Sequence, residues 1–152
     1  MHAQASQPMA DDAKIALARA LFEAWSFRAN PDDVDRYADP DIVLFDTHIG
    51  ELRGLSAIKP RVAAALAMWP DMDYEIGKVW VNPEGAAISW VMTATVTGSL
   101  ADKYGADKVG QRWRSPGISA LRMREGRVIH EYDYYDPAGL RRSLGLHKSM
   151  RA

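Results

Sequence analysis

The spacing of apolar residues along the chain changes near residue 70. In the first part most of them recur every three or four positions, which predicts helices. We expect one helix over residues 11–27, a short one ending near Tyr37, and a third over residues 56–68 with Ser56 as its cap. Residues 41–48 are rich in β-branched and aromatic side chains and predict a strand.

In the second part apolar and polar residues mostly alternate, as they do in strands. Four such segments follow one another, at residues 74–81, 86–98, 111–124 and 128–135. A polar loop at residues 101–110 is expected to join a long hairpin, and residues 137–144 to form a short turn or helix. Helices followed by consecutive strands predict an α+β fold, in which a curved antiparallel sheet wraps around the helices.

Length and composition narrow the class of protein. The 152 residues, 47% of them hydrophobic, predict one soluble domain over residues 11–146, compatible with the cytoplasm. Residues 1–10 are expected to be a disordered tail and residues 147–152 a C-terminal tail. The net charge of −1 argues against nucleic-acid or anionic-membrane partners, and no apolar run is as long as a membrane span. The absence of cysteine excludes disulfides and thiolate catalysis.

The last predicted strand carries two carboxylates on one face. Glu131 and Asp133 are two positions apart, so both point the same way, together with Ile129 and Tyr135. The opposite face is expected to carry Val128, His130, Tyr132 and Tyr134. Because both faces are half apolar, at least one carboxylate should lie against buried surface, which is costly unless the group is paired or functional.

Several short strings occur in a recognisable order. They are Leu21-Phe-Glu-Ala-Trp25, Arg53-Gly54, Trp69-Pro-Asp71, the segment from Leu121 to Tyr132, Tyr135-Asp136 and Leu144-Gly145. This order resembles the SnoaL-like branch of the nuclear-transport-factor-2-like (NTF2-like) superfamily. That group includes polyketide cyclases, ketosteroid isomerases, limonene epoxide hydrolases and scytalone dehydratases. The resemblance implies a cone-shaped α+β fold with a deep apolar pocket, often dimerised through the open sheet face, but it does not specify a reaction.

Only some of the functional residues of these families have counterparts in this sequence. Asp46 falls near the general base of ketosteroid isomerases, whereas the positions of their oxyanion hole hold Phe22 and Ser119. The catalytic aspartate of polyketide cyclases also falls at or near Ser119. The Arg-x-Asp pair of epoxide hydrolases corresponds to Trp90 and Met92, while their last-strand aspartate matches Asp133. Steroid isomerisation through the usual oxyanion hole is therefore not expected.

Three residues are the candidates for acid–base chemistry. Asp46 and His48 are expected on one strand face, close enough to share a proton, and Asp133 would orient His48 or act as a second acid or base. Alternatively, Asp46 and His48 cap a strand end in water, and Asp133 is a buried structural group. Glu131 is expected to pair with an arginine, Arg112 or Arg114. A metal site with His130 is disfavoured because His130 faces away from Asp133, so we expect no metal and no cofactor.

The remaining candidates are walls of the pocket. The residues expected to bind substrate are Trp90, Trp113, Tyr135, Met92, Ser119, Leu44 and Phe22. Flat aromatic walls suit an aromatic or polycyclic ligand. The leading hypothesis is a cofactor-independent lyase or dehydratase that acts on a hydrophobic, aromatic small molecule by general acid–base catalysis. The alternatives are an isomerase or polyketide-type cyclase, or a non-catalytic ligand-binding or assembly module. His130, Tyr132 and Tyr134 are expected to form a homodimer surface.

Overall fold

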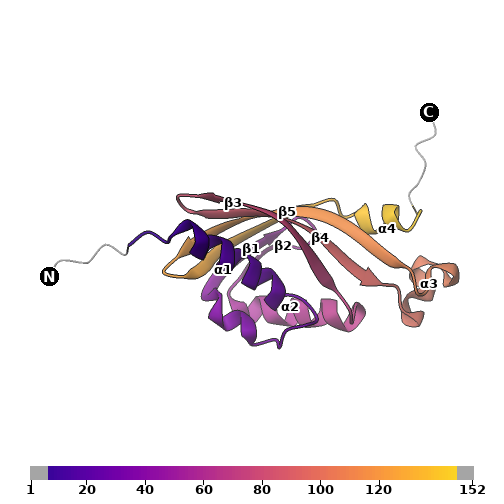
Figure 1. Cartoon of the computed structure of the whole chain (residues 1–152). Coiled ribbons are helices and arrows are strands. Elements are labelled where there is room, and N and C mark those ends of the chain that lie inside the picture. Colours follow the sequence, from indigo (N-terminus) through magenta and orange to yellow (C-terminus); the bar gives the residue numbers. More distant parts are fainter. Residues whose placement is uncertain (1–6, 147–152) are drawn as a thin grey trace.

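The computed structural model describes residues 7–146, and its elements follow the predicted order (Figure 1). The N-terminal part contains α1 (Asp11–Ala24), the 3-10 turn η1 (Asp33–Arg36), β1 (Ala38–Asp46), β2 (Gly50–Arg53) and α2 (Leu55–Met68). The second part contains β3 (Asp73–Asn82), β4 (Gly85–Thr95), η2 (Gly98–Leu100), α3 (Ala101–Tyr104), η3 (Ala106–Lys108), β5 (Arg112–Arg124), β6 (Arg127–Tyr135) and α4 (Gly139–Ser143). The prediction of an α+β fold is confirmed.

Six strands form one curved sheet in the order β2-β1-β6-β5-β4-β3. β3 to β6 are antiparallel neighbours, as predicted, whereas β1 joins the sheet parallel to β6. The expectation of a purely antiparallel sheet is therefore wrong, and β2 was not predicted at all. α1 and α2 lie on the same side of the sheet (Figure 1).

The start of α2 differs from the expected cap. The helix begins at Leu55, and Gly54 occupies the N-cap position with a φ of 81°. Ser56 therefore lies inside the first turn and makes no capping hydrogen bond. Glycine suits this position because a positive φ is strained for residues with a side chain.

The buried side chains form two clusters. The larger one joins α1 and α2 to the sheet and includes Leu21, Phe22, Ile58 and Trp90. The smaller one surrounds Trp69 and Trp113 and includes Tyr104. Tyr104 belongs to the segment expected to be a polar loop, which instead contains α3 and η3. This segment therefore contributes to the interior.

A bulge changes the expected faces of β6. His130 pairs with Arg122 but Val128 pairs with Met123, so the register shifts around Ile129. Val128 consequently points into the main core and is fully buried. The prediction that Val128 lies on the outer face, with Ile129 inward, is wrong, whereas Glu131, Asp133 and Tyr135 do share the inner face.

Two further observations concern the described residues. None of the helices within residues 7–146 is long and apolar enough to cross a membrane. The same part of the chain contains no group of three or more His, Asp or Glu side chains arranged to hold a metal ion. The expected C-terminal tail at residues 147–152 lies outside the described residues, as do residues 1–6 of the expected N-terminal tail.

Candidate active site

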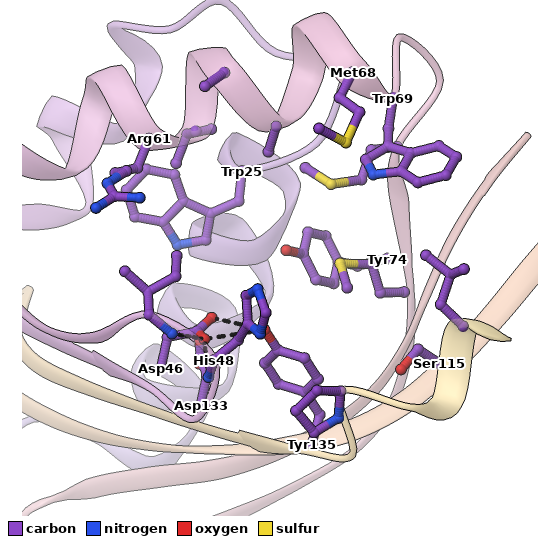
Figure 2. A pocket seen from close by; sticks show the side chains of 18 of the residues that line it. Trp25, Asp46, His48, Arg61, Met68, Trp69, Tyr74, Ser115, Asp133 and Tyr135 are labelled. Atoms are coloured by element: carbon purple, nitrogen blue, oxygen red, sulfur yellow. Dashed lines mark hydrogen bonds between the residues drawn. The ribbon is translucent and has the colours of Figure 1, made fainter. Parts of the chain in front are cut away.

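A cavity of about 590 Å³ lies against the inner face of the sheet and is also lined by residues of α2, α3 and α4. One end is polar: Asp46, His48, Asp133 and Tyr135 gather there, from the ends of β1 and β6 (Figure 2). Met68 and Trp69 line the opposite side of the same view. The cavity therefore presents acid–base groups to a largely apolar space.

Eight of the ten sequence-predicted site residues line this cavity. They are Asp46, His48, Asp133, Leu44, Trp90, Met92, Trp113 and Tyr135. Phe22 and Ser119 do not. Phe22 packs behind the wall, with its ring centroid 5.3 Å from that of Tyr74 and 6.0 Å from that of Trp90. Ser119 is completely buried and acts on the cavity only through its hydrogen bonds.

Asp46 is the last residue of β1 and organises the turn that follows. Its Oδ1 accepts hydrogen bonds from the backbone N–H groups of His48 (2.7 Å) and Ile49 (3.1 Å). The hydroxyl of Tyr135 donates to the same carboxylate, at 3.0 Å from Oδ1 and 3.2 Å from Oδ2. His48 therefore lies in the turn and not on the strand face, and it meets Asp46 through its main chain. Its imidazole lines the cavity from an exposed position.

Asp133 lies opposite Asp46 in the β1–β6 pair and belongs to a chain of hydrogen bonds. The Oγ of Ser119 donates to Asp133 Oδ1 at 2.5 Å, and the Nε1 of Trp90 donates to that same Oγ at 2.8 Å. These two hydrogen bonds hold the Asp133 carboxyl and the Trp90 ring in fixed positions. Ser119 thus connects two cavity residues, Trp90 and Asp133, through its hydroxyl group.

Glu131 is one of the cavity residues that sequence reasoning assigned wrongly. The expected partners bind elsewhere: Arg112 pairs with Asp71 at 2.9 Å and Arg114 with Glu75 at 2.7 Å. Glu131 is only 1% exposed and accepts a hydrogen bond from Trp25 Nε1 at 3.1 Å. It lines the cavity beside Asp133 and has no arginine partner among residues 7–146.

The two neighbouring carboxyls have raised pKa values. Burial raises the pKa of Asp133 to about 7, and the charge of Asp46 acts in the same direction. Burial and the Asp133 charge raise the pKa of Glu131 well above its usual value. Burial therefore favours the protonated form of both carboxyls, and Asp133, with a pKa of about 7, gains and loses its proton near neutral pH.

Two tyrosines add neutral hydroxyl groups to the polar end. Burial and the charge of Asp46 raise the pKa of Tyr135 above its usual value. Burial, followed by the charge of Asp133, raises the pKa of Tyr74 as well. Both hydroxyls therefore keep their protons and serve as hydrogen-bond donors. Tyr74 comes from β3 and was not among the predicted site residues.

The far end of the cavity is aromatic. The ring centroids of Trp69 and Trp113 are 5.2 Å apart in an edge-to-face arrangement, and those of Trp69 and Tyr104 are 5.6 Å apart. We call this group, Trp69, Tyr104 and Trp113, the aromatic lobe. The buried Nε1 of Trp113 has no hydrogen-bond partner among residues 7–146. Sequence reasoning found Trp113 but missed Trp69 and Tyr104, because neither lies on a predicted strand.

Comparison with known proteins identifies the family. A family model described as the SnoaL-like domain matches residues 18–131. The chain belongs to this family. The resemblance to the SnoaL-like branch of the NTF2-like superfamily is thereby confirmed. The sequence has no significant match among curated proteins.

Solved structures of several SnoaL-like and related proteins have the same fold. A protein from Catenulispora acidiphila with a ketosteroid isomerase-like fold, bound to trimethylamine, superposes with a TM-score of 0.71 at 20% identity, over 90% of this chain and 97% of that one. IdmH from Streptomyces antibioticus, a proposed polyketide cyclase, superposes with a TM-score of 0.72 at 16% identity. The match covers 87% of this chain and 98% of IdmH. An LEH-like epoxide hydrolase from M. tuberculosis superposes with a TM-score of 0.68 at 15% identity. The match covers 88% of this chain and 85% of the hydrolase. At these identities the similarity establishes the fold.

Proposed function

We propose that this SnoaL-like protein is an enzyme that moves protons on a hydrophobic, aromatic small molecule, and that its reaction is the elimination of water. The observation that carries the proposal is the Asp133 carboxyl, whose pKa is raised to about 7 at the polar end of an apolar cavity. A general acid or base is most effective when its pKa lies near the working pH. Asp46 supplies a second carboxylate on the neighbouring strand.

The two carboxyls have complementary roles in this reaction. Asp46, held by the Tyr135 hydroxyl and two backbone N–H groups, accepts the proton from the substrate carbon. Asp133 in its protonated form donates a proton to the departing hydroxyl, so that the C–H and C–O bonds break, a C=C bond forms and water leaves. His48 lines the same end of the cavity from the turn after Asp46, where its imidazole is open to the substrate and to solvent.

A second candidate reaction is isomerisation or cyclisation through an enolate. It is favoured by the raised pKa values of Glu131 and Asp133, because burial favours protonated carboxyls in the cavity. A protonated carboxyl and a tyrosine hydroxyl can stabilise an enolate oxygen, as they do in ketosteroid isomerase. IdmH, the proposed polyketide cyclase, has the same fold. The mass of the product separates the two reactions, because elimination removes one water and isomerisation leaves the mass unchanged.

Screening hydroxylated aromatic compounds, with products read by mass spectrometry, tests the proposal. Asp46→Ala and Asp133→Asn should each lower kcat/KM by about 100-fold or more if these groups transfer protons. The matched control for Asp46→Ala is Asp41→Ala, an exposed residue of the same strand that does not line the cavity. Full turnover in both site variants would refute the acid–base assignment. Compounds that bind without conversion would instead identify a non-catalytic binding module.

We also propose that two copies associate through the outer face of the sheet. Three large apolar side chains are exposed there: Trp80 (49%), Ile118 (42%) and Tyr134 (50%). They come from β3, β5 and β6. Ile118 and Tyr134 are direct cross-strand neighbours, and neighbouring exposed apolar side chains commonly mark an interface.

A further inference from the structure

Two cations line the cavity next to the aromatic lobe. Lys103, from α3, places its Nζ 5.4 Å from the centroid of the Tyr104 ring. Arg141, from α4, places its guanidinium carbon 5.9 Å from the same centroid. Both residues line the cavity, and α3 and α4 lie at the same end of the sheet (Figure 1). We call Lys103 and Arg141 the cationic rim.

Neither cation of the rim is neutralised by a carboxylate in the described part of the chain. The neighbouring Arg142 pairs with Asp136 at 2.6 Å, and Lys108 pairs with Asp107 at 3.3 Å. Among residues 7–146, Lys103 and Arg141 take part in no ion pair or side-chain hydrogen bond, so their donors are available to a ligand. Stacking on an aromatic ring leaves the N–H groups free to bind an anion.

The carboxyl groups that line the cavity and the cationic rim lie at different ends of it, and a further cation, Arg61 of α2, lies on the side of Trp25 and Asp46 (Figure 2). Asp46, Glu131 and Asp133 lie at one end, where their partners are neutral hydroxyl and indole groups. The cationic rim lies beside the aromatic lobe, in which Tyr104 contacts Trp69 and Trp69 contacts Trp113. An anionic group would be repelled by Asp46 and attracted by the rim. Repulsion by Asp46 and the two cations of the rim favour the orientation in which an anionic substituent lies at the rim.

We infer that the cationic rim binds a carboxylate of the substrate, so that the substrate is an aromatic carboxylic acid. Its ring system fills the aromatic lobe, and the part that reacts extends toward Asp46 and Asp133. This inference rests on the proposed function only in assuming that the cavity holds a small hydrophobic molecule. In this inference the cationic rim determines which substrates bind and takes no part in proton transfer.

Binding measurements test the inference without any turnover. Isothermal titration calorimetry compares anthracene-2-carboxylate with anthracene-2-carboxamide, which has the same shape but no charge. The protein should bind the carboxylate on the order of tenfold more tightly, as expected for two partly exposed charge pairs. The preference should decrease when the ionic strength is raised to about 1 M, because salt screens such pairs.

A matched pair of double variants locates the effect. Lys103→Gln/Arg141→Gln should abolish the preference for the carboxylate while leaving binding of the amide unchanged. Lys78→Gln/Arg124→Gln removes the same types of charge from exposed positions that do not line the cavity, and it should keep the preference. Circular dichroism checks that all variants are folded.

Four results would overturn the inference: equal or tighter binding of the amide, a preference that survives in the rim variant, equal loss of preference in both double variants, or no binding of either probe to the folded protein. Failure of the acid–base proposal has a different signature. In that case Asp133→Asn retains turnover, whereas the carboxylate preference, measured by binding alone, is unaffected.

Discussion

Asp133→Asn should make the stability of the protein less dependent on pH. Burial raises the pKa of this carboxyl from 3.8 to about 7 in the folded protein. Between these pH values the folded protein holds more protons than the unfolded chain. The contribution of Asp133 to the free energy of unfolding is therefore complete below about pH 4 and is lost as the pH rises through about 7.

The size of the effect follows from the same values. Linkage with pKa values of 3.8 and about 7 predicts a loss of about 2.6 kcal/mol between about pH 5 and about pH 8. Because Asp133 also faces an open cavity, water reduces this to about 2 kcal/mol. Asparagine keeps the shape and the acceptor for Ser119 but cannot ionise, so this part of the pH dependence should disappear.

Urea unfolding at both pH values, followed by circular dichroism, measures the difference. Glu75→Gln is the control, because Arg114 lowers the pKa of Glu75 and this contribution is lost only in acid, below the range compared. The control should therefore keep the pH dependence of the native protein between about pH 5 and about pH 8. If Asp133→Asn and the native protein have parallel pH dependences over this range, the burial of an ionisable Asp133 is refuted.

Three further predictions concern activity, packing and assembly. If Asp133 donates a proton, kcat/KM should fall above about pH 7, and a rate that rises there would assign it as the base instead. Gly117→Ala should lower stability by about 1–3 kcal/mol in thermal unfolding, since its Cβ would lie 2.6 Å from Cζ2 and Cζ3 of Trp90. Gly98→Ala, with nothing within 4 Å, should be nearly neutral, and equal losses would contradict the packing argument. Ile118→Lys should convert a dimer into a monomer in light scattering, and a native monomer would exclude the outer-face dimer.

The secondary structure could largely be predicted because it depends on local patterns. Apolar spacing in α1 and alternation in β3 to β6 are properties of neighbouring residues. The pairing of β1 with β6 could not be predicted in the same way, because it joins segments far apart in the chain. The bulge at Ile129 also escaped prediction, since strict alternation assumes a regular strand.

The candidate site shows the same division. Asp46, Asp133 and Trp90 could be selected from the sequence, because strand spacing and the family resemblance place them on the inner face. The hydrogen-bond partners of the site's carboxyl groups could not be selected from the sequence. Trp25 and Glu131 are 106 positions apart, and Asp46 and Tyr135 are 89 apart. Sequence spacing therefore suggested an arginine for Glu131, whereas the fold supplied an indole N–H.

The sequence by itself determined the fold class and the residue types available for chemistry, because both follow from local periodicity and composition. Only the tertiary structure decided which carboxyls have raised pKa values and where the cations lie. A pKa depends on burial and on nearby charges, and Asp133 acquires both from β1, β5 and its own strand. The cationic rim likewise exists only because α3 and α4 meet at Tyr104.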